Sequence, residues 1–556
     1  MGALTETEPG ERAAREPPSD TYWLTRFLFL RLLGFIYLVA FIALARQVLP
    51  LMGTHGLLPA DAFLERVREA RGGGIAGFLT VPTLFWWGIS DRLLQTLAGV
   101  GVGLSLLLFL GFANVPLLAA LWFLYMSFVH VGQLFYGYGW EILLLETGFL
   151  AIFLAPLLRP WPFPAALPTP RPVVWLLRWL VFRLMLGAGL IKIRGDTCWR
   201  DLTCMFYHYE TQPLPNPLSW YLHHLPGWIH RGEVLFNHFA ELLVPWFVFA
   251  PARFRRLAGA VLVVFQIALI LSGNLSFLNW LTITVCICCF DDGALLPLAP
   301  PPLRERVAAL RNATTLPGAR RVAVGILVAV VAFLSLNPVM NMLSPGQVMN
   351  TSFEPFELVN TYGAFGSIGR QRYEVILQGT YDATPGPEAR WLDYEFPCKP
   401  GDVNRRPCVI APYQPRLDWQ IWFAAMSDIG SEPWLVHLVY KLLTNDQAVL
   451  SLLAQSPFRQ GPPRWIRAEL YLYEFTRPGE PTRAWWKRTR TAPYMPPVSA
   501  DDPALLEFLE RYGWLSRPSA RAIGTSLSAP RRRSSAVVAR PSGEPSTIST
   551  VRVSPG

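Results

Sequence analysis

Charged side chains are scarce in this chain. Only 16% of its 556 residues are Asp, Glu, Lys or Arg, whereas soluble domains average about 25%. Hydrophobic residues make up 52% of the chain and gather in long runs. This composition excludes a disordered or collagen-like protein and argues against an ordinary soluble enzyme. Cysteine is also rare, with seven in the chain, which excludes a disulfide-dense scaffold.

Several functional signatures are missing as well. The chain contains no G-x-S-x-G nucleophile elbow and no P-loop, so it is not a standard lipase or P-loop nucleotidase. The histidines at 223, 224 and 230 lie in a loop broken by proline. Their spacing lacks the close pair and third ligand that are typical of zinc, so hydrogen bonding is the better interpretation. We therefore expect no catalytic residues, no metal and no cofactor.

The net charge of +10 does not come from one basic patch. Many of the basic residues flank apolar runs or lie in the last 40 residues. Positive flanks orient membrane helices, so we interpret the excess as a topological signal. Because no recognised nucleic-acid-binding signature is present, we expect no nucleic-acid partner.

The apolar runs predict a multi-pass α-helical membrane domain over residues 23–342. A run of about 20 residues spans a bilayer, and nine candidates occur, at 27–45, 95–112, 115–131, 142–158, 173–191, 234–250, 257–273, 276–290 and 322–342. Several are short or broken, so the number of crossings stays open. The basic loop at 253–256 is expected on the cytosolic side. We take this to require that at least one of the earlier runs does not cross, 115–131 being the weakest candidate, and that one later run, 276–290, does not cross either.

Three local features of this domain carry further expectations. Residues 53–92 do not span, and a short helix there should begin near Pro59 and stop at the glycines 72–74. Gly99 and Gly103 are four residues apart in an apolar run, which favours close packing of two helices. The sequon at Asn274 lies between two apolar runs and is expected to be too close to the bilayer for glycosylation.

After residue 342 the hydrophobic runs shorten and alternate. YEVILQGTYD and LYLYEF are typical of strands, and 432–458 has the periodicity of two amphipathic helices with a break at Asn445. We predict a β-rich (α+β) aqueous domain over residues 343–515 that folds by itself. The polar segments 1–22 and 516–556 are expected to be disordered tails.

Four charged residues stand inside apolar segments: Glu141, Glu146, Arg183 and Lys192. A charge within a membrane span is costly and is usually paired. The two glutamates are about 140° apart on a helix, which weakens a paired-carboxylate catalytic site. We expect one glutamate to pair with Arg183 or Lys192 as a structural ion pair. An integral-membrane enzyme or a transporter that uses this cluster remains the alternative.

Two cysteine pairs are disulfide candidates. Cys398 and Cys408 bracket KPGDVNRRP, a turn rich in Gly and Pro, and Cys198 and Cys204 flank WRDLT. Either bond requires an oxidising compartment. The Cys398–Cys408 loop is short, and its flexibility permits the approach of the two Cα atoms that a disulfide needs.

Four long blocks resemble the lipase maturation factor family, and its type-1 members more than its type-2 members. The blocks are 191–224, 272–282, 347–368 and 394–427, and the resemblance runs from about residue 23 to residue 515. It implies a non-enzymatic folding factor in the endoplasmic reticulum membrane. Such a factor helps secreted homodimeric lipases, such as lipoprotein lipase, to reach an active dimeric state. If the source is bacterial, the site is the cell membrane and the client is open.

The resemblance also implies that the aqueous domain is lumenal and contacts clients. A folding factor needs exposed apolar surface, and the segment LDWQIWFAAM supplies Trp419, Trp422 and Phe423 as candidate client-binding residues. Packing of the same rings in a core is the alternative. The partners expected overall are the lipid bilayer and a secreted lipase.

Overall fold

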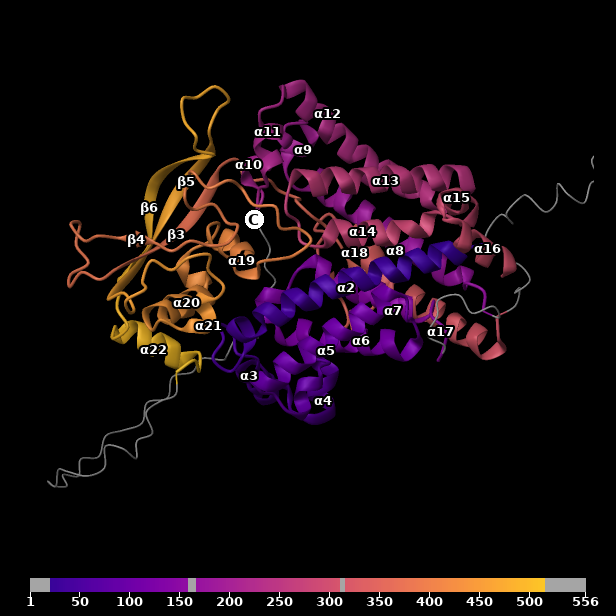
Figure 1. Ribbon diagram of the computed structural model, residues 1–556, viewed down its shortest axis with the longest axis horizontal. Helices are drawn as coiled ribbons and strands as arrows, with labels where there is room; N and C mark the ends of the chain where they lie inside the picture. Colours follow the sequence, from indigo (N-terminus) through magenta and orange to yellow (C-terminus); the bar gives the residue numbers. More distant parts are fainter. Residues whose placement is uncertain (1–20, 159–166, 311–315, 516–556) are drawn as a thin grey trace, which may run out of the picture. The chain divides into compact units, whose positions relative to one another are not determined.

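The computed structural model describes residues 21–158, 167–310 and 316–515 (Figure 1). The described residues from 21 to 500 form one compact unit, and residues 501–515, which contain helix α22 (Pro503–Arg511), belong to a second. The two expected tails lie outside the described residues, except for Thr21 and Tyr22. Tyr22 is an ordered residue, because its side chain is buried and its hydroxyl accepts a hydrogen bond from Arg178 at 2.7 Å.

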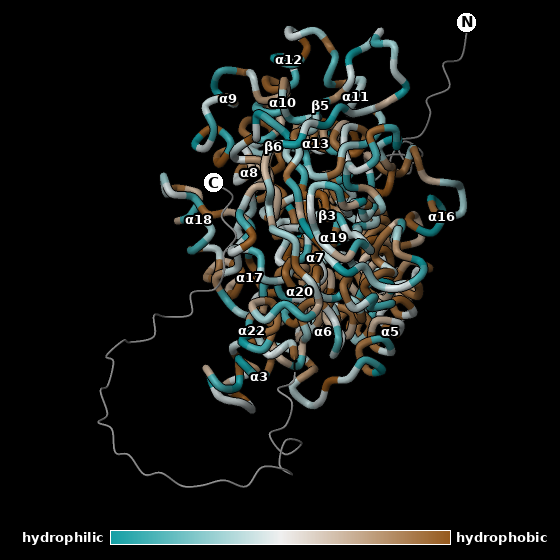
Figure 2. The backbone as a smooth tube through the Cα atoms, turned by 90° about the vertical axis from the view of Figure 1, so that its left-hand side faces the viewer, coloured by the Kyte–Doolittle hydropathy of each residue, from teal (hydrophilic) through white to brown (hydrophobic). Residues whose placement is uncertain are grey.

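Five helices among the described residues are long and apolar enough to cross a membrane. They are α2 (Trp23–Met52), α5 (Asp91–Leu110), α8 (Arg171–Arg194), α13 (Ala252–Ser272) and the joined α17 (Gly318–Leu334) and α18 (Leu336–Leu343). The stretch from Leu278 to Leu298, which begins with α14 (Leu278–Cys286), is bent by 109° and could add a sixth. The chain is therefore a multi-pass membrane protein. The segments around α5, α6 and α7 are mainly brown, that is hydrophobic, in Figure 2.

Whether the shorter apolar segments cross stays a prediction. Helix α6 (Val115–Val131) has 17 residues and α7 (Gly139–Ile152) has 14. Our reason for excluding 115–131 and 276–290 is wrong, however. The basic loop at 253–256 follows the sixth apolar run, and six crossings return the chain to its starting side. Nine crossings therefore also place this loop beside the N-terminus, as the positive-inside rule requires.

Helices α2 and α5 pack closely through glycines. A Cβ atom at Gly101 would clash with the ring of Phe41, and one at Gly34 would meet the backbone of Phe109. The predicted residues Gly99 and Gly103 have open space instead. The sequence correctly predicted that a second helix approaches this run closely. The glycine in contact with α2 is Gly101, however, whereas Gly99 and Gly103 face away from α2.

Peripheral helices fill the two long connections. Residues 53–90 contain α3 (Ala60–Arg71), α4 (Gly74–Thr80) and the 3-10 turn η1 (Leu84–Trp87). Helix α3 ends at Gly72, whose φ of 83° suits glycine, as predicted. The connection after α8 contains short helices: α9 (Thr197–Arg200), α10 (Met205–Thr211), α11 (Pro217–His223) and α12 (Gly227–His238), then η3 (Phe239–Leu243) and η4 (Val244–Phe249).

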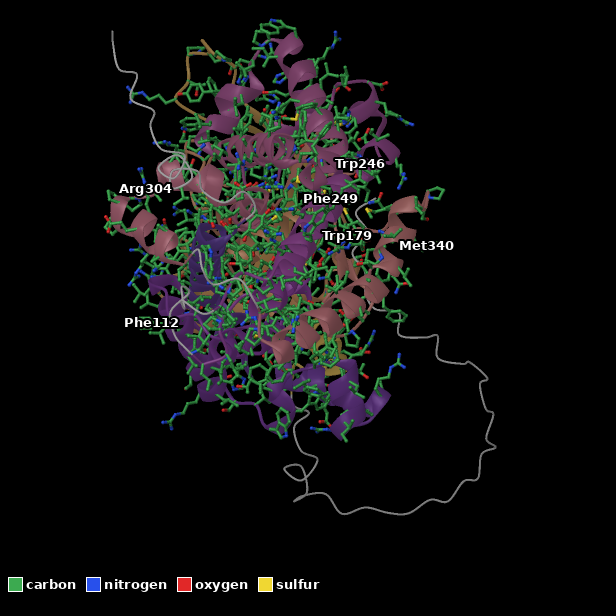
Figure 3. The ribbon with its side chains drawn as sticks, turned by 90° about the vertical axis from the view of Figure 1, so that its right-hand side faces the viewer. Phe112, Trp179, Trp246, Phe249, Arg304 and Met340 are labelled. Atoms are coloured by element: carbon green, nitrogen blue, oxygen red, sulfur yellow. A yellow bond between two sulfur atoms is a disulfide. The ribbon has the colours of Figure 1, made fainter. Side chains whose placement is uncertain are left out.

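An aromatic cluster joins α8 to η4. The ring of Phe182 lies 4.9 Å from that of Trp246 and 5.6 Å from that of Phe249, and Trp179 stacks on it at 5.5 Å. Figure 3 shows Trp179, Trp246 and Phe249 together on one side of the molecule. Because Trp246 is 58% exposed in a region of apolar helices, this cluster suits contact with lipid.

The C-terminal region is built on antiparallel sheets. Strand order in the larger sheet is β4 (Leu392–Asp393), β3 (Arg372–Thr380), β5 (Trp465–Phe475) and β6 (Trp486–Val498). A small sheet pairs β1 (Thr351–Ser352) with β2 (Asn360–Thr361). Three helices accompany them: α19 (Arg416–Ala424), α20 (Pro433–Leu443) and α21 (Gln447–Leu450). The predicted strands correspond to β3 and β5, and the predicted helix pair to α20 and α21.

The predicted boundary at residue 343 does not separate two compact units. Residues 343–500 belong to the same unit as the helices before them. Buried side chains connect the two parts, for example at Gln47, whose amide nitrogen donates to the carbonyl oxygen of Gln414 at 2.8 Å. Independent folding of residues 343–515 therefore has no support from the packing.

Candidate functional site

The carboxylate of Glu146, on α7, forms the centre of a buried network. It pairs with the guanidinium of Arg183 on α8, and both side chains are at most 2% exposed. The other carboxylate oxygen accepts hydrogen bonds from the Asn360 backbone N–H at 3.0 Å and the Tyr362 hydroxyl at 2.7 Å. Arg183 also donates to the Asn360 carbonyl oxygen. The network joins α7, α8 and strand β2, which is 214 residues away in sequence from Glu146.

Glycine allows this strand to reach the helices. A Cβ atom at Gly187 would lie 2.6 Å from the carbonyl oxygen of Tyr362, so only glycine fits on that face of α8. One at Gly195 would collide with the carbonyl oxygen of Gly366, farther along the same connection. The segment from β2 to residue 366 therefore lies directly against the C-terminal half of α8.

Glu141 takes a partner that the sequence did not suggest. It pairs with Arg416 of α19 at 2.7 Å, and both side chains are fully buried. Its carboxylate also accepts from the Tyr125 hydroxyl and from the Trp140 indole N–H at 3.0 Å. Arg416 lies over the ring of Tyr136 and donates to the Phe135 carbonyl oxygen at 2.6 Å. This second network attaches the C-terminal region to α7.

Lys192 also pairs with a residue other than the two predicted partners, Glu141 and Glu146. Its ammonium lies 2.6 Å from Glu241 Oε1 and 2.9 Å from Asn237 Oδ1. Glu241 is part of η3, a π-helical turn, and is 4% exposed. The structure pairs Glu146 with Arg183, one of the four combinations that the sequence left open, whereas Glu141 and Lys192 do not pair with each other. The sequence could have indicated Glu241 as an ion-pair partner, because its charge lies within the apolar run 234–250.

All four charged residues thus have partners of opposite charge at hydrogen-bond distance. Such an arrangement fixes helix positions, because breaking a buried pair leaves a charge without compensation. His208, a buried histidine near Lys192, is 6% exposed, and burial together with the charge of Lys192 lowers its pKa to about 4. Among the described residues no group of three or more His, Cys, Asp or Glu side chains could hold a metal ion.

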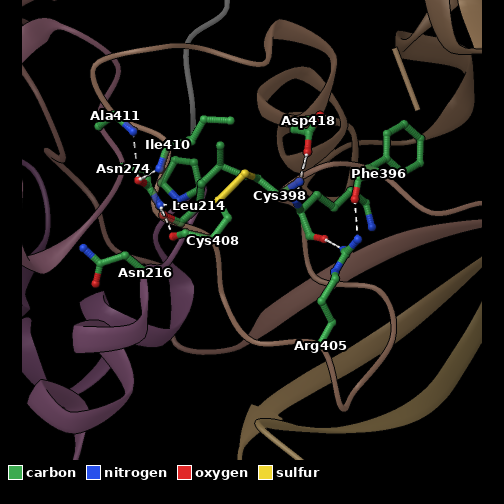
Figure 4. The surroundings of a disulfide bond; sticks show 12 residues. Leu214, Asn216, Asn274, Phe396, Cys398, Arg405, Cys408, Ile410, Ala411 and Asp418 are labelled. Carbon is green, nitrogen blue, oxygen red and sulfur yellow. Dashed lines mark hydrogen bonds between the residues drawn. A yellow bond between two sulfur atoms is a disulfide. The ribbon is translucent and has the colours of Figure 1, made fainter. Parts of the chain in front are cut away.

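Both predicted cysteine pairs lie at disulfide distance. The Cα atoms of Cys398 and Cys408 are 5.4 Å apart, and those of Cys198 and Cys204 are 4.8 Å apart. Figure 4 shows that the first bond closes a loop in which Arg405 donates to the carbonyl oxygens of Phe396, at 2.5 Å, and Lys399. The other three cysteines are free and buried.

Asn274 anchors this loop to the helical region. Its amide nitrogen donates to the Cys408 carbonyl oxygen at 2.9 Å and to that of Leu214 at 3.2 Å, and its oxygen accepts from Ile410 N at 2.9 Å (Figure 4). With 2% of its side chain exposed, Asn274 acts as a structural bridge between α13 and the disulfide loop.

Replacing Cys398 and Cys408 with serine is expected to lower the free energy of unfolding by about 2–3 kcal/mol, because the loop that the bond closes is short. Chemical denaturation of the purified protein measures this change. Non-reducing peptide mapping of the unmodified protein should recover the two cysteines in one linked peptide pair. Free thiols at both positions would contradict the bond and the oxidising location together.

A buried carboxyl beside the disulfide gives a pH dependence. Asp418 accepts hydrogen bonds from the N–H groups of Cys398 at 2.6 Å and Lys399 at 2.9 Å. Burial raises its pKa from 3.8 to about 6. Between pH 4 and pH 6 the native state therefore binds more protons than the unfolded chain, and stability falls as pH rises through this window.

We expect Asp418→Asn to remove this slope, since the amide oxygen keeps both acceptor contacts without the charge. The stability of the unmodified protein relative to the variant should fall by about 3 kcal/mol from pH 4 to pH 7. Denaturation curves at matched pH values measure the difference. A relative stability that stays constant, or rises with pH, would contradict the assignment.

The candidate client-binding rings mostly pack inside the protein. Trp419 is 5% exposed and contacts Trp140 at 5.0 Å between ring centroids, so it offers no open surface. Trp422 donates to the Thr211 carbonyl oxygen at 3.1 Å, and Phe423 packs on its ring at 4.9 Å. Both are half-buried, because α19 lies against α7 and α10. The alternative of core packing therefore holds for Trp419.

Comparisons with known proteins agree with this two-part architecture. The model of the lipase maturation factor transmembrane domain matches residues 24–296, and that of the lipase maturation factor C-terminal domain matches residues 358–496. Lipase maturation factor 1 of Bos taurus is 52% identical over 511 residues, which cover 87% of this chain and 90% of that protein. The Homo sapiens protein of the same name is 49% identical over 534 residues, 91% of this chain and 93% of its own length.

Identity to a second branch is lower. Lipase maturation factor 2 of Xenopus laevis is 33% identical over 631 residues, which cover 91% of this chain and 86% of that protein. No solved structure matches this chain. The chain belongs to the lipase maturation factor family, and it is more similar to these type-1 members than to the type-2 member.

Proposed function

We propose that this chain is a membrane-embedded maturation factor for secreted lipases. The observation that carries the proposal is its identity of 52% and 49% to two proteins named Lipase maturation factor 1, over about nine tenths of each chain. Similarity of this extent covers the helical region, the sheets and the connection between them. The helical region is embedded in the lipid bilayer, and the client is a homodimeric lipase of the lipoprotein lipase type.

The proposed location is the endoplasmic reticulum membrane, with the C-terminal region in the lumen. Two pairs of cysteines at disulfide distance support it, because such bonds persist in oxidising compartments. Cys398 and Cys408 lie in the C-terminal region, and Cys198 and Cys204 pack with Ile368 in one core cluster. In a bacterial source the equivalent location is the cell membrane, with the same region outside.

The proposed role is that of a chaperone and not of an enzyme or a transporter. Enzymes and transporters use intramembrane charges that are accessible to a substrate or an ion. Here Glu141, Glu146, Arg183 and Lys192 are bonded to protein groups and are at most 5% exposed. Their arrangement supports the integrity of the helical region and its attachment to the sheets.

Within the predicted client-binding segment, the end of α19 is the accessible part. Met426 is 54% exposed, and it follows the half-buried Trp422 and Phe423. Methionine is flexible and polarizable, which suits an apolar contact with a partly folded chain. We place one client contact at this helix end.

Secretion of active lipase tests the function. Cells that lack an endogenous maturation factor receive lipoprotein lipase with or without this chain, and activity per mass of secreted lipase is measured. We expect the chain to raise specific activity several-fold. A chain that is expressed and disulfide-bonded but leaves specific activity unchanged would reject the proposal.

Photo-crosslinking in the full-length protein tests the contact. A photoreactive amino acid at position 426 is expected to capture newly made lipase, whereas the same group at the exposed position 459 is the matched control. Capture at 459 alone, or at neither position while specific activity rises, would reject the contact at α19 and leave the function in place.

A further inference from the structure

Residues 72–90 combine exposure with an absence of charge. The segment GGGIAGFLTVPTLFWWGIS contains no Asp, Glu, Lys, Arg or His. It forms α4 and η1, yet Ile75 is 80% exposed, Leu79 53% and Trp87 76%. Exposed apolar side chains on adjacent turns of an uncharged segment indicate a surface that contacts something other than water.

The segment leaves and returns on the same side of the helical region. Asp91, the first residue of α5, accepts hydrogen bonds from Thr54 just after α2, at 2.7 Å from its N–H and 3.1 Å from its hydroxyl. The two ends of the 53–90 connection are therefore held together. The C-terminal region lies on this side as well, because His437 bonds the Leu57 carbonyl oxygen at 2.8 Å.

Contacts with α6 place the segment at the depth of the membrane core. The hydroxyl of Thr83 donates to the Ser127 carbonyl oxygen at 3.1 Å, and Leu84 N–H donates to the Ser127 hydroxyl at 3.0 Å. The ring of Phe78 lies 6.2 Å from that of Phe123. Both α6 residues are two positions from Tyr125.

The position of Tyr125 fixes this depth. Its ring lies 5.9 Å from that of Tyr37 and 5.3 Å from that of Phe41, in the middle of α2. At a rise of about 1.5 Å per residue, these two residues are about 16–22 Å from the C-terminal end of α2. Helix α2 has 30 residues and is about 45 Å long, so it extends about 7 Å beyond each side of a hydrocarbon core about 30 Å thick. The two residues therefore lie about 9–15 Å deep, in a leaflet whose hydrocarbon is about 15 Å thick. A segment that packs beside Tyr125 on the outside of α6 thus lies within the hydrocarbon.

We propose that residues 72–90 form a re-entrant wedge in the leaflet on the side of the C-terminal region, with Ile75, Leu79 and Trp87 against lipid acyl chains. Helix α5, which follows the segment directly in the sequence, also exposes apolar side chains, among them Val100, Leu106 and Leu107. Figure 1 shows α4 beside α6, in agreement with the contact between Phe78 and Phe123. The preceding helix, α3, has charged side chains along its length and fits the headgroup region.

Depth-dependent fluorescence quenching of the full-length protein tests this wedge. Cys286, Cys288 and Cys289 are first replaced by alanine, so that an introduced cysteine is the one free thiol. An environment-sensitive fluorophore is attached at 75 or at 79, and the protein is reconstituted in phosphatidylcholine vesicles with or without nitroxide-labelled acyl chains. Position 65 on α3 and position 382 in the C-terminal region, both exposed, are the matched controls.

We expect nitroxide lipids to quench the fluorophore at 75 and 79 at least two-fold more than at 382, and aqueous iodide to do the reverse. Position 65 should respond to both quenchers. Strong iodide quenching at 75 and 79 would overturn the proposal, since the segment would then face water. Protection from both quenchers would overturn it too, because a second copy of the chain or another protein would then cover the surface. An intact Cys398–Cys408 bond in each labelled protein verifies folding.

Discussion

Substitution of Arg416 by methionine is expected to lower the free energy of unfolding by about 3–5 kcal/mol and to loosen the C-terminal region from the helices. Arg416 is fully buried between the two parts. Its guanidinium donates hydrogen bonds to the Glu141 carboxylate and the Phe135 carbonyl oxygen. Its backbone N–H donates to the side-chain oxygen of Gln47 at 3.0 Å. Methionine fills a similar length but leaves the Glu141 carboxylate charged, buried and unpaired.

Two measurements on the purified protein check this outcome. Thermal denaturation reports the loss of stability, and limited proteolysis should cut the connection between α18 and β3 faster in the variant. Arg459→Met is the matched control, because Arg459 is exposed in the same region, and surface substitutions usually change stability by less than about 0.5 kcal/mol. Equal stability of the two variants would show that the Arg416 pair contributes nothing to the attachment.

Substitution of Glu146 by glutamine is expected to be about as damaging. Glutamine is nearly isosteric, but it cannot compensate the charge of Arg183, which is 2% exposed. It also turns one acceptor oxygen into a donor facing the Asn360 N–H and the Tyr362 hydroxyl, two groups that themselves donate. The expected loss is about 3–5 kcal/mol, the range for breaking a buried pair.

A double-mutant cycle with Arg183→Met isolates the pair from other effects. Because the double variant buries no unpaired charge, it should be more stable than the sum of the two single losses predicts, with a coupling of about 1–3 kcal/mol. Glu305→Gln, at an exposed position of α16 (Pro301–Ala309), is the matched control. Strict additivity of the two single effects would contradict a direct pairing.

The sequence was informative where structure depends on near neighbours. Strand β3, strand β5, the helix pair α20 and α21 and the stop at Gly72 follow from local patterns, and so does the short Cys398–Cys408 loop. Strand β6 was not predicted. It contains Pro493, Pro496 and Pro497, which a central strand excludes. β6 tolerates these prolines because it lies at the edge of the sheet and its register with β5 is irregular. Backbone N–H groups on its outer side have no partner strand, so a missing N–H costs no hydrogen bond there.

Partners across long separations were not predictable in the same way. The charges in the membrane segments indicated that ion pairs must exist, because an unpaired charge is too costly there. The choice of Arg416 for Glu141 depends on how α19 packs 275 residues later. For the same reason, the sequence located the aromatic segment around Trp419 but could not tell a docking surface from a buried contact with Tyr138 and Trp140.

The bridge formed by Asn274 has a consequence for the order of biosynthetic events. Asn274, Leu275 and Ser276 form a glycosylation sequon, and the folded protein engages the amide nitrogen that would accept the sugar. The partner loop at 408–411 emerges from the ribosome more than 130 residues later, so during that interval the acceptor amide lacks its bond to Cys408 and has only the longer contact with Leu214. A glycan added then would fill the space of the disulfide loop and prevent its docking. A sugar at Asn274 would therefore identify chains in which the disulfide loop did not dock onto Asn274 before glycosylation.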